Sequence, residues 1–138
     1  MQYVEIEDLI RQEQKIQLGS FIGSVDIDEY LSKIKNNADI VTFYSKGKCV
    51  GFIAFYCNDE KTKQAFITLV LIEKNHRGMG LSSILMDGVV KIIKKRGFKS
   101  CKLEVKKNNM PAIKLYSKHG FKVIDDLDIK HIMDLDIS

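Results

Sequence analysis

Apolar residues recur at helical spacing in the first clear element of the chain. Asp26 is followed three residues later by Glu29, which is the pattern of a capping box. The positions that then repeat with a helical period are Ile27, Tyr30, Leu31 and Ile34. This pattern predicts an amphipathic helix over residues 26–37. Residues 3–15 show a weaker helical pattern, for which a short strand over residues 2–6 is the alternative.

Three β-rich stretches follow this helix. They read DIVTFYS from residue 39, KCVGFIAFYC from residue 48 and QAFITLVLI from residue 64. Two polar segments, KGK and NDEKTK, separate the stretches and have the composition of turns. Strands joined by such short turns pair antiparallel, so the pattern predicts a three-stranded meander.

The period changes from that of a strand to that of a helix near Gly80. One apolar face is formed by Leu81, Leu85, Val89 and Ile92 or Ile93. The pattern predicts a helix over residues 78–96. It ends at Gly97, because glycine readily takes the left-handed conformation that follows a helix.

The last third of the chain continues the alternation of strands and helices. A strand is expected over residues 99–106, and Asn109 then has the side chain of a helix cap. Gly120 ends that helix, and two strands, over about 121–125 and 129–137, follow. The order of elements predicts an α/β (α+β) fold with one largely continuous sheet.

Length and composition are those of an ordinary globular domain. The chain has 138 residues, of which 45% are hydrophobic and 29% charged, so we expect a single domain over residues 1–138. The first ten residues carry acids where a signal peptide would carry bases. No apolar run approaches the roughly 18 residues of a membrane span. We therefore expect a cytoplasmic protein that does not enter a membrane.

Neither the cysteines nor the histidines have the spacing of a metal site or a redox motif. The cysteines are Cys49, Cys57 and Cys101, and the histidines are His76, His119 and His131. The cysteines are odd in number and lie in apolar, strand-like stretches, which favours reduced residues of the core. We expect no disulfide and no bound metal.

Charge is distributed unevenly along the chain. Residues 1–40 hold eight acids and four bases, whereas residues 91–107 hold eight bases and one acid. The tail after Val123 is acidic again. Solvated helix faces account for most runs of this kind, but a central basic zone also fits a polyanionic ligand.

The segment NHRGMGLSS, at residues 75–83, joins the third β-rich stretch to the helix after it. The first N–H groups of a helix have no partner within the helix and carry the positive end of its dipole. Gly78 and Gly80 let a ligand approach the backbone, and Ser82 and Ser83 add hydroxyl donors. The turn therefore suits an anion such as a diphosphate, although a plain strand-to-helix connection is equally compatible with it. It matches neither a P-loop nor a dinucleotide-binding fingerprint.

Residues 67–121 resemble the GNAT superfamily of acyl-CoA N-acyltransferases. The turn of that superfamily reads R-x-x-G-x-G/A, and its later segment reads LEV, N-x-x-A, LY and GF. This chain has RGMGLS at 77–82, followed in order by LEV, NMPA, LY and GF. The sixth turn position is serine, where the family has glycine or alanine. The resemblance implies a mixed central sheet with an antiparallel N-terminal meander and helices on both faces.

The resemblance also implies acetyl-CoA as cosubstrate. The turn amides would hold the pyrophosphate, the strand before the turn would pair with the pantetheine arm, and Asn109 would contact the pantetheine or cap its helix. The residues implied in cofactor binding are Val70, Leu71, Ile72, Arg77, Gly78, Met79, Gly80, Leu81, Ser82, Ser83 and Asn109.

Two side chains are implied in catalysis. An alkyl amine is almost fully protonated at neutral pH, so a general base would help to generate the nucleophile. Glu104 and Tyr116 match the base and the acid of the branch that acetylates the N-termini of ribosomal proteins. Glu104 also alternates away from its apolar neighbours on the expected strand. Glu73, or a relay of water, remains the alternative base.

The resulting prediction is an N-acetyltransferase that transfers an acetyl group to a primary amine by direct attack in a ternary complex. The acceptor could be a small molecule, an amino sugar or a peptide N-terminus. A CoA-binding regulatory or inactive relative is the alternative. Nucleic-acid binding is disfavoured, since the basic run offers only Phe98 for stacking. The apolar last strand could also pair across a homodimer.

Overall fold

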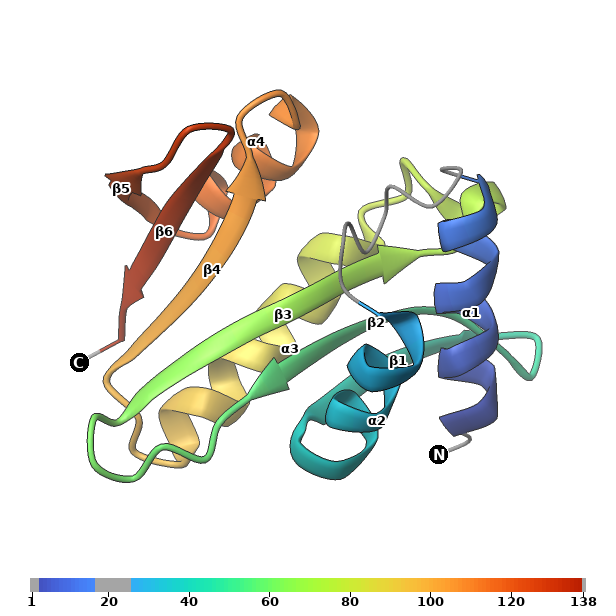
Figure 1. Ribbon diagram of the computed structural model, residues 1–138, viewed down its shortest axis with the longest axis horizontal. Coiled ribbons are helices and arrows are strands. Elements are labelled where there is room, and N and C mark those ends of the chain that lie inside the picture. Colours follow the sequence, from blue (N-terminus) through green and yellow to red (C-terminus); the bar gives the residue numbers. More distant parts are fainter. Residues whose placement is uncertain (1–2, 17–25, 138) are drawn as a thin grey trace.

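Residues 3–16 and 26–137 are described by a computed structural model, shown in Figure 1. The helices are α1 (Tyr3–Ile16), α2 (Ile27–Asn37), α3 (Leu81–Lys95) and α4 (Met110–Lys118), with a short 3₁₀-helix, η1 (Lys74–His76). The strands are β1 (Asp39–Ser45), β2 (Lys48–Tyr56), β3 (Gln64–Ile72), β4 (Ser100–Lys106), β5 (Lys122–Asp126) and β6 (Lys130–Asp136).

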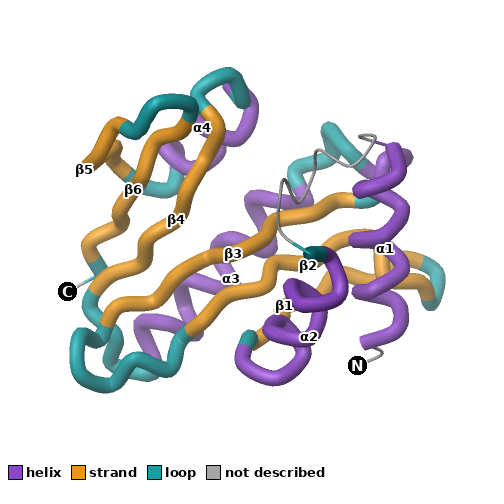
Figure 2. The backbone as a smooth tube through the Cα atoms, in the orientation of Figure 1, coloured by secondary structure: helices purple, strands orange, loops and turns teal. Residues whose placement is uncertain are grey.

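The strands form one six-stranded sheet in the order β1-β2-β3-β4-β6-β5. Only the β3–β4 pair is parallel, and the other neighbours are antiparallel. Helices α1 and α2 cover one face, and α3 runs along the other face (Figures 1 and 2). The mixed sheet, the N-terminal meander and the helices on both faces confirm the predicted fold.

Strand β2 lies at the centre of the core because it is buried on both faces. Ile53 and Phe55 belong to the apolar cluster beneath α3, whereas Phe52 and Ala54 belong to the cluster beneath α1 and α2. All four side chains have 0% exposure. A nearly continuous apolar run is the pattern of a strand covered on both sides. Cys49, Cys57 and Cys101 are buried in these clusters.

The helix boundaries follow their caps. Asp26 accepts hydrogen bonds from the amides of Asp28 and Glu29, which confirms the predicted start of α2. Residues 3–16 form α1, so the strand alternative is wrong for the residues described there. Helix α3 begins at Leu81 rather than at residue 78, because both glycines before it have left-handed backbone angles that are incompatible with an α-helix.

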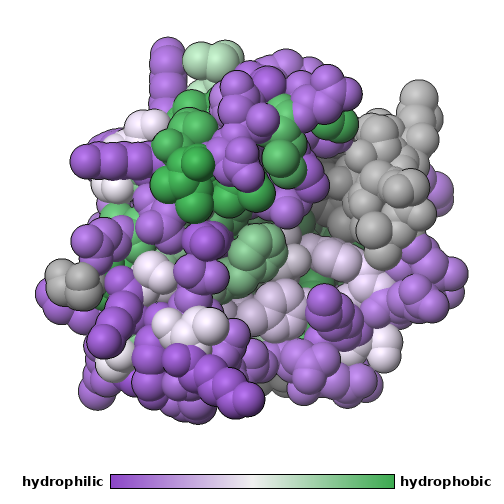
Figure 3. All heavy atoms as spheres, turned by 60° about the vertical axis from the view of Figure 1, so that its left-hand side comes forward, coloured by the Kyte–Doolittle hydropathy of each residue, from purple (hydrophilic) through white to green (hydrophobic). Residues whose placement is uncertain are grey.

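The last strand is not at the edge of the sheet. β6 lies between β4 and β5, and β5 is the edge strand at this end of the sheet. The expectation that the last strand pairs across a homodimer is therefore wrong, because β4 and β5 already occupy both of its sides. On β5, Val123 and Ile124 are 48% and 53% exposed. Figure 3 brings this side of the molecule forward and shows apolar side chains among polar ones.

Strands β3 and β4 separate partway along their length. They pair only from Gln64–Ile67 to Ser100–Leu103, and beyond this point they diverge (Figures 1 and 2). Thr68 is an extra residue on β3, because its neighbours Ile67 and Leu69 pair with consecutive residues of β2. A bulge of this kind bends the strand that contains it. Beyond the divergence, β3 remains paired with β2 and β4 with β6, but the two strands have no neighbouring strand on the sides that face each other.

Within the described residues, no helix combines the length and the apolar composition that crossing a bilayer requires.

Candidate active site

The turn before α3 presents uncapped backbone amides. Gly78 and Gly80 have φ angles of 80° and 77°, which residues with a Cβ atom rarely adopt. Gly80 is the N-cap of α3, and no side chain accepts a hydrogen bond from the first turn there. The first N–H groups of α3 are therefore left for another acceptor. They carry the positive end of the helix dipole, which favours an anion.

A cavity of about 620 Å³ lies against this turn. It extends from the start of α3, past the end of β3, to α4. All the residues predicted to bind the cofactor line it except Met79, whose side chain is 62% exposed. The cavity is large enough for an extended ligand such as a nucleotide carrying a long arm.

Arg77 is held from two sides. Its Nε donates to the carbonyl oxygen of Ile72 at 3.0 Å, and its Nη2 donates to Oε1 of Glu13 at 2.7 Å. Glu13 is only 7% exposed and lines the same cavity. Glu13 was not predicted, because no local pattern links a residue of α1 to the turn.

A second cavity, of about 260 Å³, occupies the space where β3 and β4 diverge. It is lined by residues of both strands, including Thr68 and Glu104. The two cavities share three lining residues, which are Val70, Asn109 and Tyr116. They therefore meet between β3 and α4, at the N-cap and the last turn of that helix.

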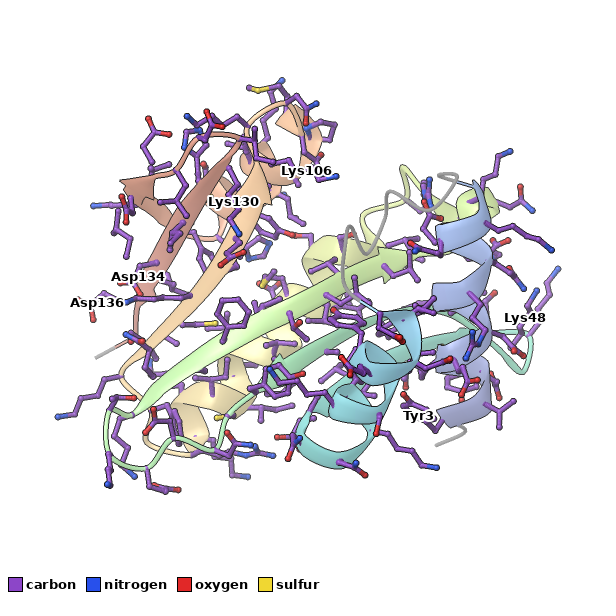
Figure 4. All side chains as sticks on the ribbon, in the orientation of Figure 1. Tyr3, Lys48, Lys106, Lys130, Asp134 and Asp136 are labelled. Carbon is purple, nitrogen blue, oxygen red and sulfur yellow. The ribbon has the colours of Figure 1, made fainter. Side chains whose placement is uncertain are left out.

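Glu104 points away from the core, as its alternation predicts. It is exposed, and its Oε1 accepts a hydrogen bond from Lys130 Nζ at 2.6 Å. Lys130 begins β6 and lies opposite Lys106 in the sheet (Figure 4). Lys130 was not foreseen, because the pairing of β6 with β4 brings together residues that are 26 positions apart.

Tyr116 is enclosed by the core. Its side chain is 8% exposed, and its ring centroid lies 5.9 Å from that of Phe121. Burial raises the pKa of Tyr116 to about 12, because the phenolate would lose its hydration. The hydroxyl therefore keeps its proton at neutral pH.

Asn109 caps α4, since its Oδ1 accepts a hydrogen bond from the amide of Ala112 at 3.3 Å. The same residue lines both cavities. Capping occupies the side-chain oxygen, and the amide NH₂ group is the part of Asn109 that is left to contact a ligand.

Glu73, at the end of β3, stabilises the short helix η1. It caps η1 by accepting from the amide of Asn75 at 3.0 Å, and its Oε1 lies 2.7 Å from His76 Nδ1. The hydrogen bond to His76 is the largest cause of the lowered pKa of Glu73. Glu73 lines neither of the two cavities described above, which disfavours it as the base.

The basic run contributes less to the site than its charge suggests. Of residues 91–107, only Glu104, Val105 and the flanking Leu103 and Lys106 reach the second cavity, and none reaches the first. The cationic side chains at the first cavity are instead those of Arg77 and Lys118. Most of residues 91–107 therefore lie on other surfaces of the molecule. This agrees with the interpretation that solvated helix faces account for the basic run.

Comparison with protein families gives a match over residues 6–121 to the family described as acetyltransferase (GNAT). The chain is 33% identical over 79 residues to N-alpha-acetyltransferase MAK3 of Arabidopsis thaliana, covering 56% of this chain and 42% of that protein. It is 28% identical to the probable spermine N(1)-acetyltransferase of Bacillus subtilis subsp. natto, covering 64% and 62% of the two chains. The chain thus spans less than two thirds of either relative.

Solved structures of low sequence identity share the fold. The PaiA N-acetyltransferase of Thermoplasma acidophilum, in complex with coenzyme A, has a TM-score of 0.76 at 17% identity, covering 97% of this chain and 92% of that chain. The ribosomal-protein-S18-alanine N-acetyltransferase of Escherichia coli has a TM-score of 0.72 at 22% identity, covering 83% and 78%.

Proposed function

The chain belongs to the acetyltransferase (GNAT) family, and we propose that it transfers an acetyl group from acetyl-CoA to a primary amine in a ternary complex. The observation that carries the proposal is the meeting of two cavities. The larger cavity begins at the uncapped turn, the smaller one opens between β3 and β4, and both are lined by Tyr116. Two substrates bound in these cavities would approach each other beside its hydroxyl.

The larger cavity suits the cosubstrate. Amides at the start of α3 would bind the pyrophosphate, as uncapped helix N-termini bind phosphates elsewhere. Beyond its last pair with β4 at Ile67, β3 has backbone groups that face no neighbouring strand on that side. These groups would hydrogen-bond the pantetheine arm, as the strands of a sheet do. Val70, Leu71 and Ile72, which belong to this segment, line the cavity.

The reaction needs one proton removed and one proton supplied. The neutral amine nitrogen forms a bond to the thioester carbonyl carbon, and the carbon–sulfur bond breaks. Tyr116 is the proposed acid that protonates the departing thiolate, since burial keeps its hydroxyl protonated. A free backbone N–H of β3 would stabilise the charge that develops on the carbonyl oxygen.

Glu104 is the proposed base that takes the proton of the amine. It lines the smaller cavity together with Tyr116, and its carboxylate is held by Lys130 at 2.6 Å. A cationic amine entering the cavity would compete with Lys130 for that carboxylate. A relay of water to the solvent is the alternative route for the same proton.

For the acceptor we propose a peptide N-terminus. After Leu103, β4 is paired with β6 but has no neighbouring strand on its β3 side, where an extended peptide would pair with it, and such pairing is a common mode of peptide recognition. The N-alpha-acetyltransferase among the relatives supports this class. A polyamine is the second candidate, supported by the relative named as a probable spermine N(1)-acetyltransferase. Among the described residues, Glu104 is the one carboxylate that lines the smaller cavity, and a single carboxylate is few for a polycation.

Two measurements test the proposal. Thermal melting with acetyl-CoA, coenzyme A and ATP should show stabilisation by the two CoA species alone, because a ligand at 100 times its Kd stabilises by about 2.7 kcal/mol. Thiol release should then be measured with peptides of varied N-terminal residue, with spermine and with an amino sugar. Release with peptides supports the acceptor proposed here. A melting shift without release from any amine would favour the CoA-binding, inactive alternative.

A further inference from the structure

Three side chains near the turn form a chain of polar contacts. Ser83 lies in the first turn of α3, and its Oγ is 2.9 Å from Nε2 of His119. The other ring nitrogen, Nδ1, lies 3.1 Å from Oδ1 of Asp87, one helical turn after Ser83. The side chain of His119 is 10% exposed. Each ring nitrogen therefore has one fixed partner.

The chemistry of the partners decides where the protons lie. An ionised carboxylate only accepts hydrogen bonds, so Nδ1 of His119 must carry a proton toward Asp87. In the neutral ring, Nε2 is then an acceptor, and the hydroxyl of Ser83 donates to it. In the charged ring, Nε2 donates to Ser83 Oγ, and the hydroxyl proton is free to point elsewhere.

Ser83 lines the larger cavity, whereas neither His119 nor Asp87 does. With a neutral ring, Ser83 presents lone pairs to the cavity, which repel an anion. With a charged ring, Ser83 presents a donor, and one more positive charge stands directly behind it. An anion in the cavity is therefore bound more tightly when His119 is protonated.

We infer that His119 is a positioning residue for the anionic group in the larger cavity, acting through the hydroxyl of Ser83. This inference rests on the proposed binding of the CoA pyrophosphate at the turn. By linkage, binding of the anion takes up a proton at His119. The affinity for the anion is consequently lower when His119 has lost its proton.

The groups around His119 agree with this assignment. From α3, Asp87 faces the ring and favours its charged form. From α4, Lys118 precedes His119 and lines the larger cavity, and its charge opposes protonation until an anion is bound. The backbone N–H of His119 is used by carbonyl oxygens of α4. A bound anion therefore relieves the repulsion between two neighbouring cations.

Serine hydrolases use the same order of groups, with the serine as nucleophile. In those enzymes the aspartate is buried, whereas the side chain of Asp87 is 63% exposed. An exposed carboxylate is screened by water and is a weak support for a charged histidine during catalysis. The contact of Ser83 with an anion site accounts for the arrangement without a nucleophilic step.

Isothermal titration calorimetry with coenzyme A tests the inference. Titrations at pH 7 in two buffers of different ionisation enthalpy measure the number of protons taken up. Wild type should take up more protons than His119→Gln, since the glutamine amide donates to Ser83 Oγ but cannot be protonated. Protons taken up by His76 or by coenzyme A itself cancel in this difference. His131→Gln, on β6 and outside the larger cavity, should behave as wild type.

The affinities provide a second readout. His119→Gln should keep a Kd within about threefold of wild type at pH 7, whereas His119→Leu should weaken coenzyme A by roughly tenfold. In steady state, His119→Leu should raise KM for acetyl-CoA and leave kcat nearly unchanged. Equal proton uptake in wild type and His119→Gln would overturn the role of His119, while the cofactor site would stand. No binding of coenzyme A to wild type would instead overturn the proposed function and this inference with it.

Discussion

Arg77 and Glu13 join the turn before α3 to helix α1, through a 2.7 Å contact between residues 64 positions apart. The two side chains differ sharply in exposure, at 48% for Arg77 and 9% for Glu13. The buried carboxylate of Glu13 is less hydrated than the guanidinium of Arg77, so its charge depends more on the contact between them. Helix α1 is thereby part of the support of the turn.

Removing either member of this pair should destabilise the protein unequally. Arg77→Gln removes the cation that lies 2.7 Å from the buried carboxylate of Glu13 and should lower the free energy of unfolding by about 2 kcal/mol, more than Glu13→Gln does. The exposed pair of Arg11 and Asp28, also at 2.7 Å, is the control, and Arg11→Gln should cost under about 1 kcal/mol. Chemical denaturation measures all three. A larger loss in Glu13→Gln than in Arg77→Gln would contradict the assignment.

Gly80→Ala should separate cofactor binding from stability. Gly80 has φ 77° and space for a Cβ, and so does Gly47, at φ 78° in the turn between β1 and β2. Either substitution should cost about 1–2 kcal/mol, because both force alanine into the left-handed region. Only Gly80→Ala should weaken coenzyme A, since the amides beside it face the larger cavity. Equal melting shifts with coenzyme A in the two variants would argue against the turn as the anion site.

Glu104→Gln should lower kcat by about 10²-fold at neutral pH and leave the Kd for acetyl-CoA nearly unchanged, because a general base typically contributes that much. Glu60→Gln is the matched control, since it removes a carboxylate from another exposed lysine pair, in the turn after β2. Its kcat should equal that of wild type. Thiol release measures both, and full turnover in Glu104→Gln would leave the water relay as the route of the proton.

Tyr116→Phe should lower kcat by about 10²-fold while the fold is kept, because the packing of the ring against Phe121 is retained. The raised pKa of about 12 also predicts a pH signature. The folded state binds the proton of Tyr116 more tightly than the unfolded state, so this stabilisation is complete below about pH 10 and is lost as the pH rises toward 12. The stability of wild type relative to Tyr116→Phe should therefore fall only above about pH 10. An unfolded variant would show that the hydroxyl serves the structure.

The cysteines should not react in the folded protein. Burial raises the pKa of Cys49 and Cys57, and it raises that of Cys101 to about 12. Thiolates are the reactive form, so a disulfide reagent at pH 8 should detect no thiol before unfolding and three thiols in denaturant. Rapid reaction of a cysteine in the native protein would contradict this. The result also decides whether thiol release can be followed continuously without a background from the protein.

Much of the local structure was determined by the sequence alone. Side chains such as Asp26 and Asn109 cap the amides that directly follow them, so the start of each helix can be predicted from three or four residues. The turn before α3 was also recognisable from the sequence, because the positive φ angles of Gly78 and Gly80 depend on residue type. The spacing of apolar residues predicted the strands of the meander and the apolar face of α3.

Pairing between distant elements was decided by the tertiary structure. The bulge at Thr68 and the divergence of β3 from β4 depend on how β2 and β4 hold β3 from its two sides. The position of β6 inside the sheet brings Lys130 to Glu104, and the C-terminal end of α4 brings His119 to Ser83 in the first turn of α3. Periodicity tells which face of an element is buried, but it contains no information about which polar side chain of another element will face it. Those contacts form only when burial of the apolar faces has set the relative positions of the elements.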